Sequence, residues 1–283
     1  MNKLSPERRA AVVRGLVEGN SIRATVRMTG AAKNTVTKLL VELGEACYEY
    51  QDRVLRDLTT KQVQCDEVWS FIGCKEKNVP SSKRGKFGVG DVWTWTALDA
   101  DTKLMISWQV DRRDARAARD FIEDLSSRLA NRVQLTTVGL KAYLEAVEDG
   151  FGGAVDYATL VKLYGSDATE GEKRYSRAVC IGAEKRRITG RPDPKHVSTS
   201  YVERQNLTMR MGMRRFTRLT NAFSKKPANH ACAISLHFMY YNFARPHQSL
   251  KTEKGYEPTP AMAAGIADHV WSIEEIVALL GSN

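Results

Sequence analysis

Apolar residues in the N-terminal segment 1–56 recur every three or four positions, the spacing of amphipathic helices. Ser5 is followed by Pro6, a pair that predicts the start of a first helix because serine caps helices and proline suits their first position. Ser21 predicts the start of a second, short helix, and Gly30 predicts a tight turn before a third helix. The pattern therefore predicts a small all-α head.

The third helix of the head is expected to begin with polar residues and to continue with an apolar stripe. The stripe consists of Val36, Leu39, Leu40 and Leu43. The polar residues at the start are Lys33, Asn34, Thr37 and Lys38. Two helices joined by a glycine turn are typical of a helix-turn-helix, whose second helix places such residues against the base edges and phosphates of DNA. A plain three-helix bundle with a polar surface is the alternative, and the basic charge of the chain makes us favour DNA binding.

Beyond the head, the apolar spacing changes from the helical period to the alternation of strands. One β-type run is QVQCDEVWSFIG (62–73), and DVWTWTALDADTKLMISWQV (91–110) predicts two strands joined by a turn. A helical stripe over 114–130, the strand RVQLTTV (132–138) and a helix near 140–148 follow. This order predicts an α/β domain in which helices pack on the faces of a mixed sheet.

The composition indicates a folded, basic protein. A chain of 283 residues with 42% hydrophobic residues can bury a sizeable core, and its length suggests two domains. The net charge of +10 makes a polyanion the expected partner. The sequence has neither an apolar run of about 20 residues nor the apolar part of a signal peptide, so we expect a cytoplasmic protein. Five cysteines without a C-x-x-C pair favour neither a disulfide framework nor a zinc site.

Two carboxylates of the larger domain are candidates for chemistry. Asp66 lies within an apolar strand, where a charged side chain costs several kcal/mol unless a metal or a partner compensates it. Alternation puts Asp66 and Glu67 on opposite faces, and the pattern alone leaves an outward-facing Asp66 open as the alternative. Glu203 lies in STSYVERQNLTMRMGMRRF (198–216), a segment that predicts a helix with Ser200 as its cap.

The helix that carries Glu203 is expected to bury one stripe and to expose another. The buried stripe is Val202, Met209, Met213 and Phe216. Glu203 stacks with Arg210 and Arg214 on an adjacent face, because residues seven and eleven positions on return to the same side of a helix. One interpretation is a surface set that adds little stability. The other is a metal-binding acid flanked by guanidinium groups that bind phosphate.

Several stretches of the chain carry a family resemblance. They are RATVRMTGAAKNTVTKLL in the head, CDEVWSFIG, TTVGLKAYLEAVE, YVERQNLTMRM and FMYYNFARPHQSL. In combination they resemble insertion-sequence transposases of the DDE type, in particular the insertion-sequence-one group. The resemblance spans nearly the whole chain. It implies a ribonuclease-H-like catalytic domain in which two aspartates and a glutamate hold two divalent ions, Mg²⁺ or Mn²⁺.

The resemblance also implies an organisation and a function. Residues 1–56 would form the helix-turn-helix domain, 57–255 the catalytic domain with an insertion near 150–197, and 256–283 a C-terminal helical tail. Such proteins bind transposon terminal inverted repeats in double-stranded DNA, cleave and join strands there, and work as homodimers or larger homo-oligomers. We therefore expect a nucleoid-associated protein in which Arg210 contacts the transposon end.

Position 138 departs from the family pattern. The resemblance makes Asp66 the first acid and Glu203 the third, and the family sequence T-T-D-G places the second acid where this chain has Val138. The spacings of 72 residues from Asp66 and 65 residues to Glu203 fit the family layout. The acids that could take its place are Asp99, Asp101, Asp149 and Asp156, and none of them is convincingly placed. We therefore expect an impaired catalytic site of Asp66, Val138 and Glu203, or alternatively an inactive, repressor-like DNA-binding protein.

Overall fold

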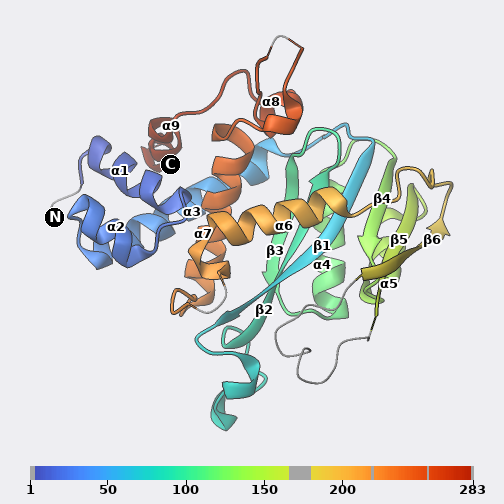
Figure 1. Cartoon of the computed structure of the whole chain (residues 1–283), viewed down its shortest axis with the longest axis horizontal. Helices are drawn as coiled ribbons and strands as arrows, with labels where there is room; N and C mark the ends of the chain where they lie inside the picture. Colours follow the sequence, from blue (N-terminus) through green and yellow to red (C-terminus); the bar gives the residue numbers. More distant parts are fainter. Residues whose placement is uncertain (1–3, 166–179, 218–219, 254, 282–283) are drawn as a thin grey trace.

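A six-stranded mixed sheet lies at the centre of the computed structural model (Figure 1), which describes residues 4–165, 180–217, 220–253 and 255–281. The strands are β1 (Gln62–Ile72), β2 (Gly90–Asp99), β3 (Met105–Asp111), β4 (Val133–Val138), β5 (Val155–Tyr164) and β6 (Cys180–Thr189). Their order is β3-β2-β1-β4-β5-β6. Strand β4 runs parallel to β1 and β5, and the other neighbouring pairs are antiparallel. The predicted mixed α/β class is confirmed, and the ribonuclease-H-like fold stays a prediction.

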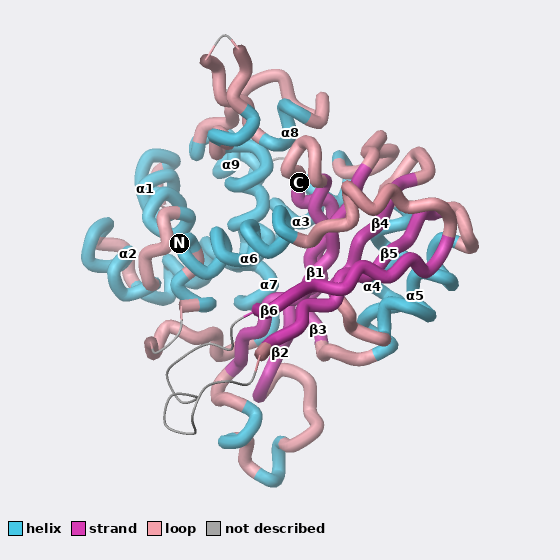
Figure 2. The backbone as a smooth tube through the Cα atoms, turned by 45° about the vertical axis from the view of Figure 1, so that its right-hand side comes forward, coloured by secondary structure: helices cyan, strands magenta, loops and turns pink. Residues whose placement is uncertain are grey.

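The helices divide between the two faces of the sheet and a bundle beside it. The helices on the sheet are α4 (Ala115–Ser127), α5 (Ala142–Phe151) and α6 (Ser200–Gly212). The others are α1 (Pro6–Val17), α2 (Ile22–Thr29), α3 (Lys33–Val54), α7 (Pro227–Met239), α8 (Pro260–Ala263) and α9 (Ile273–Ala278). Figure 2 shows α6 on one side of the sheet and α4 with α5 on the other. No helix in the described ranges is long and apolar enough to cross a membrane.

The alternation of β1 decides which side chains meet α6. Gln64 and Asp66 form hydrogen bonds with groups of α6. Cys65 and Glu67 lie on the opposite face, near Tyr143 of α5. Successive side chains of a strand point to opposite faces of the sheet, so the predicted separation of Asp66 from Glu67 is confirmed.

Side-chain caps begin the first two helices of the head where the sequence predicts them. The hydroxyl oxygens of Ser5 and Ser21 accept hydrogen bonds from the amides of Arg8 at 3.4 Å and Ala24 at 3.1 Å. Gly30 has a φ of +66° and ends α2 in the left-handed conformation that glycine adopts without a steric cost. The three predicted helices therefore form as expected.

Helix α3 connects the head to the rest of the molecule. It packs along α7, and Gly44 lies so close to Cys232 that a Cβ atom at position 44 would overlap the cysteine. The side-chain amide of Gln51 donates to the carbonyl oxygen of Ser235 at 3.2 Å. Helix α9 packs against α1, and one hydrophobic core runs from the head into the sheet domain. The predicted domain boundary after the head stays a prediction.

The segment expected as an insertion, 150–197, contributes to the sheet. It contains β5, which pairs with β4, and β6, which forms the edge of the sheet. Residues 166–179 of this segment lie outside the described residues. The extent of the insertion therefore stays a prediction.

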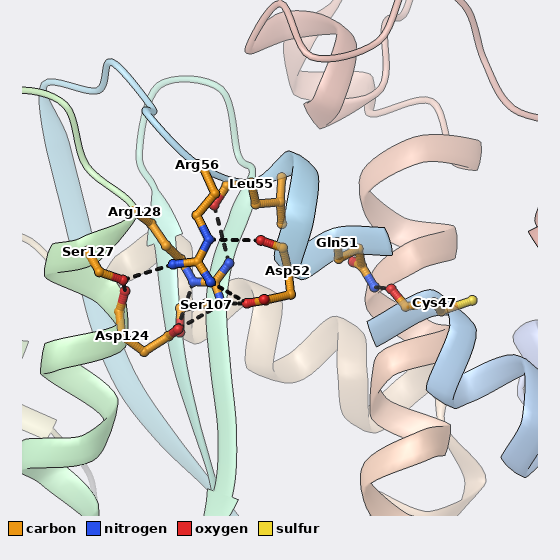
Figure 3. A network of polar contacts seen from close by, with 9 residues as sticks. All are labelled: Cys47, Gln51, Asp52, Leu55, Arg56, Ser107, Asp124, Ser127 and Arg128. Atoms are coloured by element: carbon orange, nitrogen blue, oxygen red, sulfur yellow. Dashed lines mark hydrogen bonds and ion pairs between the residues drawn. The ribbon is translucent and has the colours of Figure 1, made fainter. Parts of the chain in front are cut away.

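A buried arginine ties the end of α3 to the end of α4 (Figure 3). Arg128 is 5% exposed and donates to the carboxylates of Asp124 at 2.7 Å and Asp52 at 2.6 Å. Its Nη1 donates to the carbonyl oxygen of Leu55 at 3.2 Å. Arg56 contacts the same Asp52 carboxylate at 2.5 Å from a more exposed position. Because Asp52 belongs to the head and Asp124 to α4, Arg128 fixes the head against the sheet domain.

Two buried histidines on α7 favour the neutral form. The ring nitrogens of His230 lie 3.1 Å from the Ser70 hydroxyl and 2.7 Å from the Ser224 hydroxyl. In the described structure, neither ring nitrogen of His237 has a hydrogen-bond partner. Burial lowers the pKa of both histidines to about 3, and a nearby arginine adds to the effect in each case. Protonation of either ring therefore opposes folding.

Replacement of Arg128 by methionine is expected to lower the free energy of unfolding by about 2 kcal/mol, because two carboxylates lose a desolvated partner. Arg56→Met removes a more exposed partner of Asp52 and is expected to cost less than about 1 kcal/mol. Urea unfolding of the full chain measures both values. Equal losses would show that the buried guanidinium has no special role.

Acidification is expected to destabilise the protein through the two histidines. Their pKa is about 3 in the folded chain and near 6.5 in an unfolded one. The neutral histidines therefore leave the free energy of unfolding at its full value above about pH 6.5, and this free energy decreases as the pH falls below that value. By about pH 5.5 the loss amounts to about 1.4 kcal/mol for each histidine. His237→Leu should remove about half of this pH dependence in urea unfolding. An unaltered pH dependence in His237→Leu would contradict the assignment.

Candidate functional site

Asp66 lies in the middle of β1 with both carboxylate oxygens hydrogen-bonded. Its Oδ1 accepts from the amide of Glu67 at 2.8 Å, and its Oδ2 accepts from Nδ2 of Asn206 in α6 at 2.8 Å. The hydroxyl oxygen of Thr96 in β2 lies 2.9 Å from the backbone carbonyl oxygen of Asp66 and 3.3 Å from the side-chain Oδ1 of Asn206, so its one proton is shared between these two acceptors. Asn206 therefore joins α6 to two central strands at the acid.

The Asp66 carboxyl group is poorly solvated. Burial raises its pKa to about 7, and the negative charges of Glu67 and Glu203 act in the same direction. The hydrogen bonds from the Glu67 amide and from Asn206 lower the pKa, but less than burial raises it. A buried carboxyl group with a strongly shifted pKa is typical of functional sites and of structural ion-pair networks alike.

Gln64 fixes the first turn of α6 over β1. The N-cap residue of α6 is Thr199, whose side chain forms no capping hydrogen bond, so the prediction of Ser200 as the cap is wrong. Instead, Oε1 of the buried Gln64 accepts from the amides of Tyr201 at 2.9 Å and Val202 at 3.2 Å. These amides have no partner within the helix, so Gln64, a residue of the sheet, caps them.

Glu203 lies in this first turn and has both carboxylate oxygens engaged. Its Oε1 accepts from the Thr199 hydroxyl at 2.7 Å, and its Oε2 accepts from the ammonium group of Lys162 in β5. Burial works against the charge of Lys162, but the hydrogen bond to Glu203 and the charge of Glu203 outweigh it and raise the pKa of the lysine. The positive charge of Lys162 is therefore held at the candidate site.

Val138 lies on the same face of the sheet as Asp66 and Lys162. The parallel register of β1 with β4, extended by one residue, makes Asp66 and Val138 neighbours. The register of β4 with β5 pairs Val138 with Leu160, which shares a face with Lys162 by strand alternation. Residues in register on parallel strands point to the same side. The α6 side of the sheet therefore presents an acid, a valine and a lysine on successive strands.

The remaining acids lie away from this face or this end of the sheet. Asp99 accepts the amide of Asp101 at 2.8 Å in the turn between β2 and β3. Asp149 and Asp156 form surface ion pairs with arginines at 3.1 Å and 2.8 Å. Glu67 is buried on the opposite face and pairs with an arginine at 3.0 Å. None of them takes the place of an acid at position 138.

The donor set does not fit a pair of divalent ions. Mg²⁺ prefers several oxygen ligands, and this face offers the carboxylates of Asp66 and Glu203 beside an apolar side chain, an ammonium group and an amide N–H. Within the described ranges, no group of three or more histidine, cysteine, aspartate or glutamate residues could hold a metal ion. The two-ion site expected of an intact family member therefore does not form from these residues.

Two residues of this site escape the sequence patterns. Lys162 lies in a strand whose sequence gives little indication of a catalytic or binding role. Only the pairing of β5 with β4 brings it near Val138. Asn206 follows Glu203 by three residues, a spacing that puts both on one helical face. That spacing is the one signal by which Asn206 could have been found.

The residues predicted to read DNA lie at the start of α3. Lys33, Asn34 and Lys38 are exposed there, and the half-buried Thr37 donates its hydroxyl to the Lys33 carbonyl oxygen at 3.0 Å. Lys38 also pairs with Glu42 at 3.5 Å, a helical i,i+4 contact on the surface. The polar start of the helix is therefore accessible, and its role in DNA binding stays a prediction.

Helix α6 ends earlier than the sequence predicts. It stops at Gly212, where the chain meets the turn between α1 and α2: a Cβ atom on Gly19 would lie 3.0 Å from the Gly212 carbonyl oxygen. Arg210 is in the last turn and half-buried, whereas Arg214 is exposed in a short 3₁₀ turn beyond the helix. The predicted stack of Glu203, Arg210 and Arg214 on one helix is therefore wrong. The predicted apolar stripe is buried, namely Val202, Met209, Met213 and Phe216.

Comparisons with known proteins find remote likenesses in structure. No family model and no curated protein matches the chain. A piggyBac transposase synaptic complex with hairpin DNA is 12% identical over 99% of this chain and 71% of that chain, with a TM-score of 0.39. A Mos1 mariner paired end complex with Mn is 11% identical over 54% and 57%, and a Mos1 strand transfer complex is 11% identical over 85% and 79%, both with a TM-score of 0.23. Identities and scores this low do not assign an activity.

Replacement of Gln64 by leucine is expected to destabilise the protein by about 1–2 kcal/mol, because two amides of α6 lose a buried acceptor. Gln62→Leu, on the same face of β1 and two residues earlier, serves as the control and is expected to have a smaller effect. Urea unfolding and amide hydrogen exchange of Tyr201 and Val202 measure the change. Unaltered protection of these two amides in Gln64→Leu would contradict the capping role.

Proposed function

We propose that this chain is a DDE-type transposase that binds transposon ends in double-stranded DNA and whose cleavage and strand transfer are impaired by Val138. The observation that carries the proposal is the meeting of Asp66, Val138 and Glu203 on the α6 side of the sheet. Each comes from the element that the family resemblance assigns to one of the three acids. The order of strands and helices around them supports the same interpretation.

The loss of the second acid accounts for the impairment. Phosphodiester cleavage needs a water molecule or a 3′-hydroxyl group aligned with the leaving oxygen. When bound, two divalent ions activate this nucleophile and stabilise the leaving oxygen. Of the three acids that the family resemblance assigns to this task, Asp66 and Glu203 are present, and the side chain of Val138 supplies no oxygen ligand beside them. The chain as it stands is therefore expected to bind DNA and to turn over poorly or not at all.

DNA engagement is assigned to the basic head. The chain carries a net charge of +10, and the polar residues at the start of α3 are exposed. In a helix-turn-helix these residues enter the major groove, whereas Arg210 would contact DNA nearer the acids. Two transposon ends related by symmetry would call for a homodimer or a larger homo-oligomer.

A second candidate function is that of a DNA-binding protein without catalysis, such as a repressor. The ion pair between Lys162 and Glu203 favours it, because a balanced site has no need of a metal. Both candidates bind DNA, and they differ in whether a restored acid brings back cleavage. A nicking assay on DNA that carries the ends of the element separates them.

Replacement of Val138 by aspartate is expected to restore Mg²⁺- or Mn²⁺-dependent cleavage of end-containing DNA. Valine and aspartate have similar volumes, so the fold should accept the change, and a gain of about 1.4 kcal/mol in transition-state stabilisation already raises the rate tenfold. Adding Asp66→Asn to Val138→Asp should abolish the gain. Robust cleavage by the unaltered chain would overturn the role assigned to position 138, and a folded, DNA-binding but silent Val138→Asp would favour the repressor-like function.

Replacement of Lys33 by alanine is expected to weaken the binding of end-containing DNA by the full chain. Loss of one phosphate contact should also reduce the slope of log K against log salt by about one. Lys251→Ala, at an exposed position outside the head, is the control. Fluorescence anisotropy over a range of salt concentrations measures both quantities. Unchanged affinity and slope in Lys33→Ala would remove the support for a DNA-reading role of α3.

A further inference from the structure

The contact of Lys162 with Glu203 is a second constraint on the site, independent of Val138. We propose that the Lys162 ammonium group takes the place of a divalent cation at Glu203, so that the site is balanced by its own side chains. This inference rests on the proposed function, because it concerns the same three positions. It predicts that a restored acid at position 138 meets a competitor for the metal.

The hydrogen bonds at the two acids support this inference. Both oxygens of Glu203 have donors, the Thr199 hydroxyl at 2.7 Å and the Lys162 ammonium group. Both oxygens of Asp66 have donors as well, one of them Nδ2 of Asn206 at 2.8 Å. A metal ligand must offer lone pairs to the cation, and an N–H or O–H group engages one of the two lone pairs on each of these oxygens. A cation that enters the site therefore competes with donors already in place.

The positive charge of Lys162 makes it the donor that competes directly with a cation. Thr199 and Asn206 are neutral, whereas Lys162 carries a full positive charge on a flexible stem. The side chains of Lys162 and Glu203 are 34% and 29% exposed, so dissolved ions can reach the pair. Exclusion of a metal is therefore electrostatic rather than steric. A neutral side chain at position 162 should remove this electrostatic exclusion.

Positions 138 and 162 contribute to metal affinity in different ways. Val138→Asp adds a carboxylate next to Asp66 but leaves the ammonium group on Glu203. Lys162→Gln frees Glu203 but leaves an apolar side chain at position 138. Only the double variant offers three carboxylates without an internal cation. The two substitutions are therefore expected to act together on metal affinity.

Titration of the full-length protein with Mn²⁺ alone, without DNA, tests this inference. Electron paramagnetic resonance of free Mn²⁺ gives the affinity, a readout that does not depend on catalysis. We expect no measurable site in the unaltered chain, a weak site in Val138→Asp, and a site about tenfold tighter when Lys162→Gln is added. Val138→Asp with Lys162→Arg, which keeps the charge, should bind like Val138→Asp alone.

A matched control removes a lysine from the neighbouring strand. Lys185 of β6 is in register with Leu160, and its ammonium group donates to the carbonyl oxygen of Pro194 at 2.6 Å. Adding Lys185→Gln to Val138→Asp changes the net charge of the protein by the same amount and should leave the Mn²⁺ affinity unchanged. If Lys185→Gln raised the Mn²⁺ affinity as much as Lys162→Gln does, the effect would come from overall charge. That result would overturn the specific role of Lys162.

The remaining outcomes separate this inference from the proposed function. Equal Mn²⁺ affinities of Val138→Asp with and without Lys162→Gln would overturn the inference, as would a tight Mn²⁺ site in the unaltered chain. Binding of end-containing DNA by the same variants tests the proposed function separately. Loss of DNA binding in every variant would contradict the proposed function, whereas the Mn²⁺ affinities would still decide the role of Lys162. Thermal melting of each variant confirms that the proteins compared are folded.

Discussion

The contact between α6 and β1 is the constraint on which the candidate site depends. Glu203 follows Asp66 by 137 residues in the chain, and two side-chain amides bring them together. Gln64 accepts the first free amides of α6, and Asn206 donates to the Asp66 carboxylate. Both amides are buried, so their hydrogen bonds are costly to break and fix the height and rotation of the helix over the sheet. The acids are positioned by neutral groups that do not themselves need a metal.

A second organising feature is the packed connection between the head and the sheet domain. Helix α3 is exposed and polar where it begins and is buried against α7 farther along. At its end, Asp52 and Arg128 join it to α4. DNA held by the start of α3 would therefore lie in a fixed relation to the α6 side of the sheet. This relation would serve a transposase and a repressor-like binder equally, and the chemistry of the acids alone distinguishes them.

The local features of the fold could be predicted from the sequence, and the contacts across elements could not. Caps, glycine turns and alternation depend on neighbouring residues, so Ser5, Ser21, Gly30 and the faces of β1 follow the predicted pattern. The end of α6 at Gly212 lies against Gly19 of the head, a contact that the helical periodicity does not reveal. Lys162 and Asn206 likewise acquire their roles from strand pairing and from the rotation of α6. The family resemblance predicted a role for position 138 and gave no indication of Lys162 on the neighbouring strand.

In our proposal the ammonium group of Lys162, rather than a divalent ion, balances the charge of Glu203. Crystals of the unaltered chain soaked in Mn²⁺ and measured at the manganese absorption edge test this proposal, because anomalous scattering locates the ion itself. We expect no anomalous peak between Asp66 and Glu203, with the Lys162 ammonium group on the Glu203 carboxylate. A peak bound to both carboxylates, with Lys162 turned away, would contradict the claim.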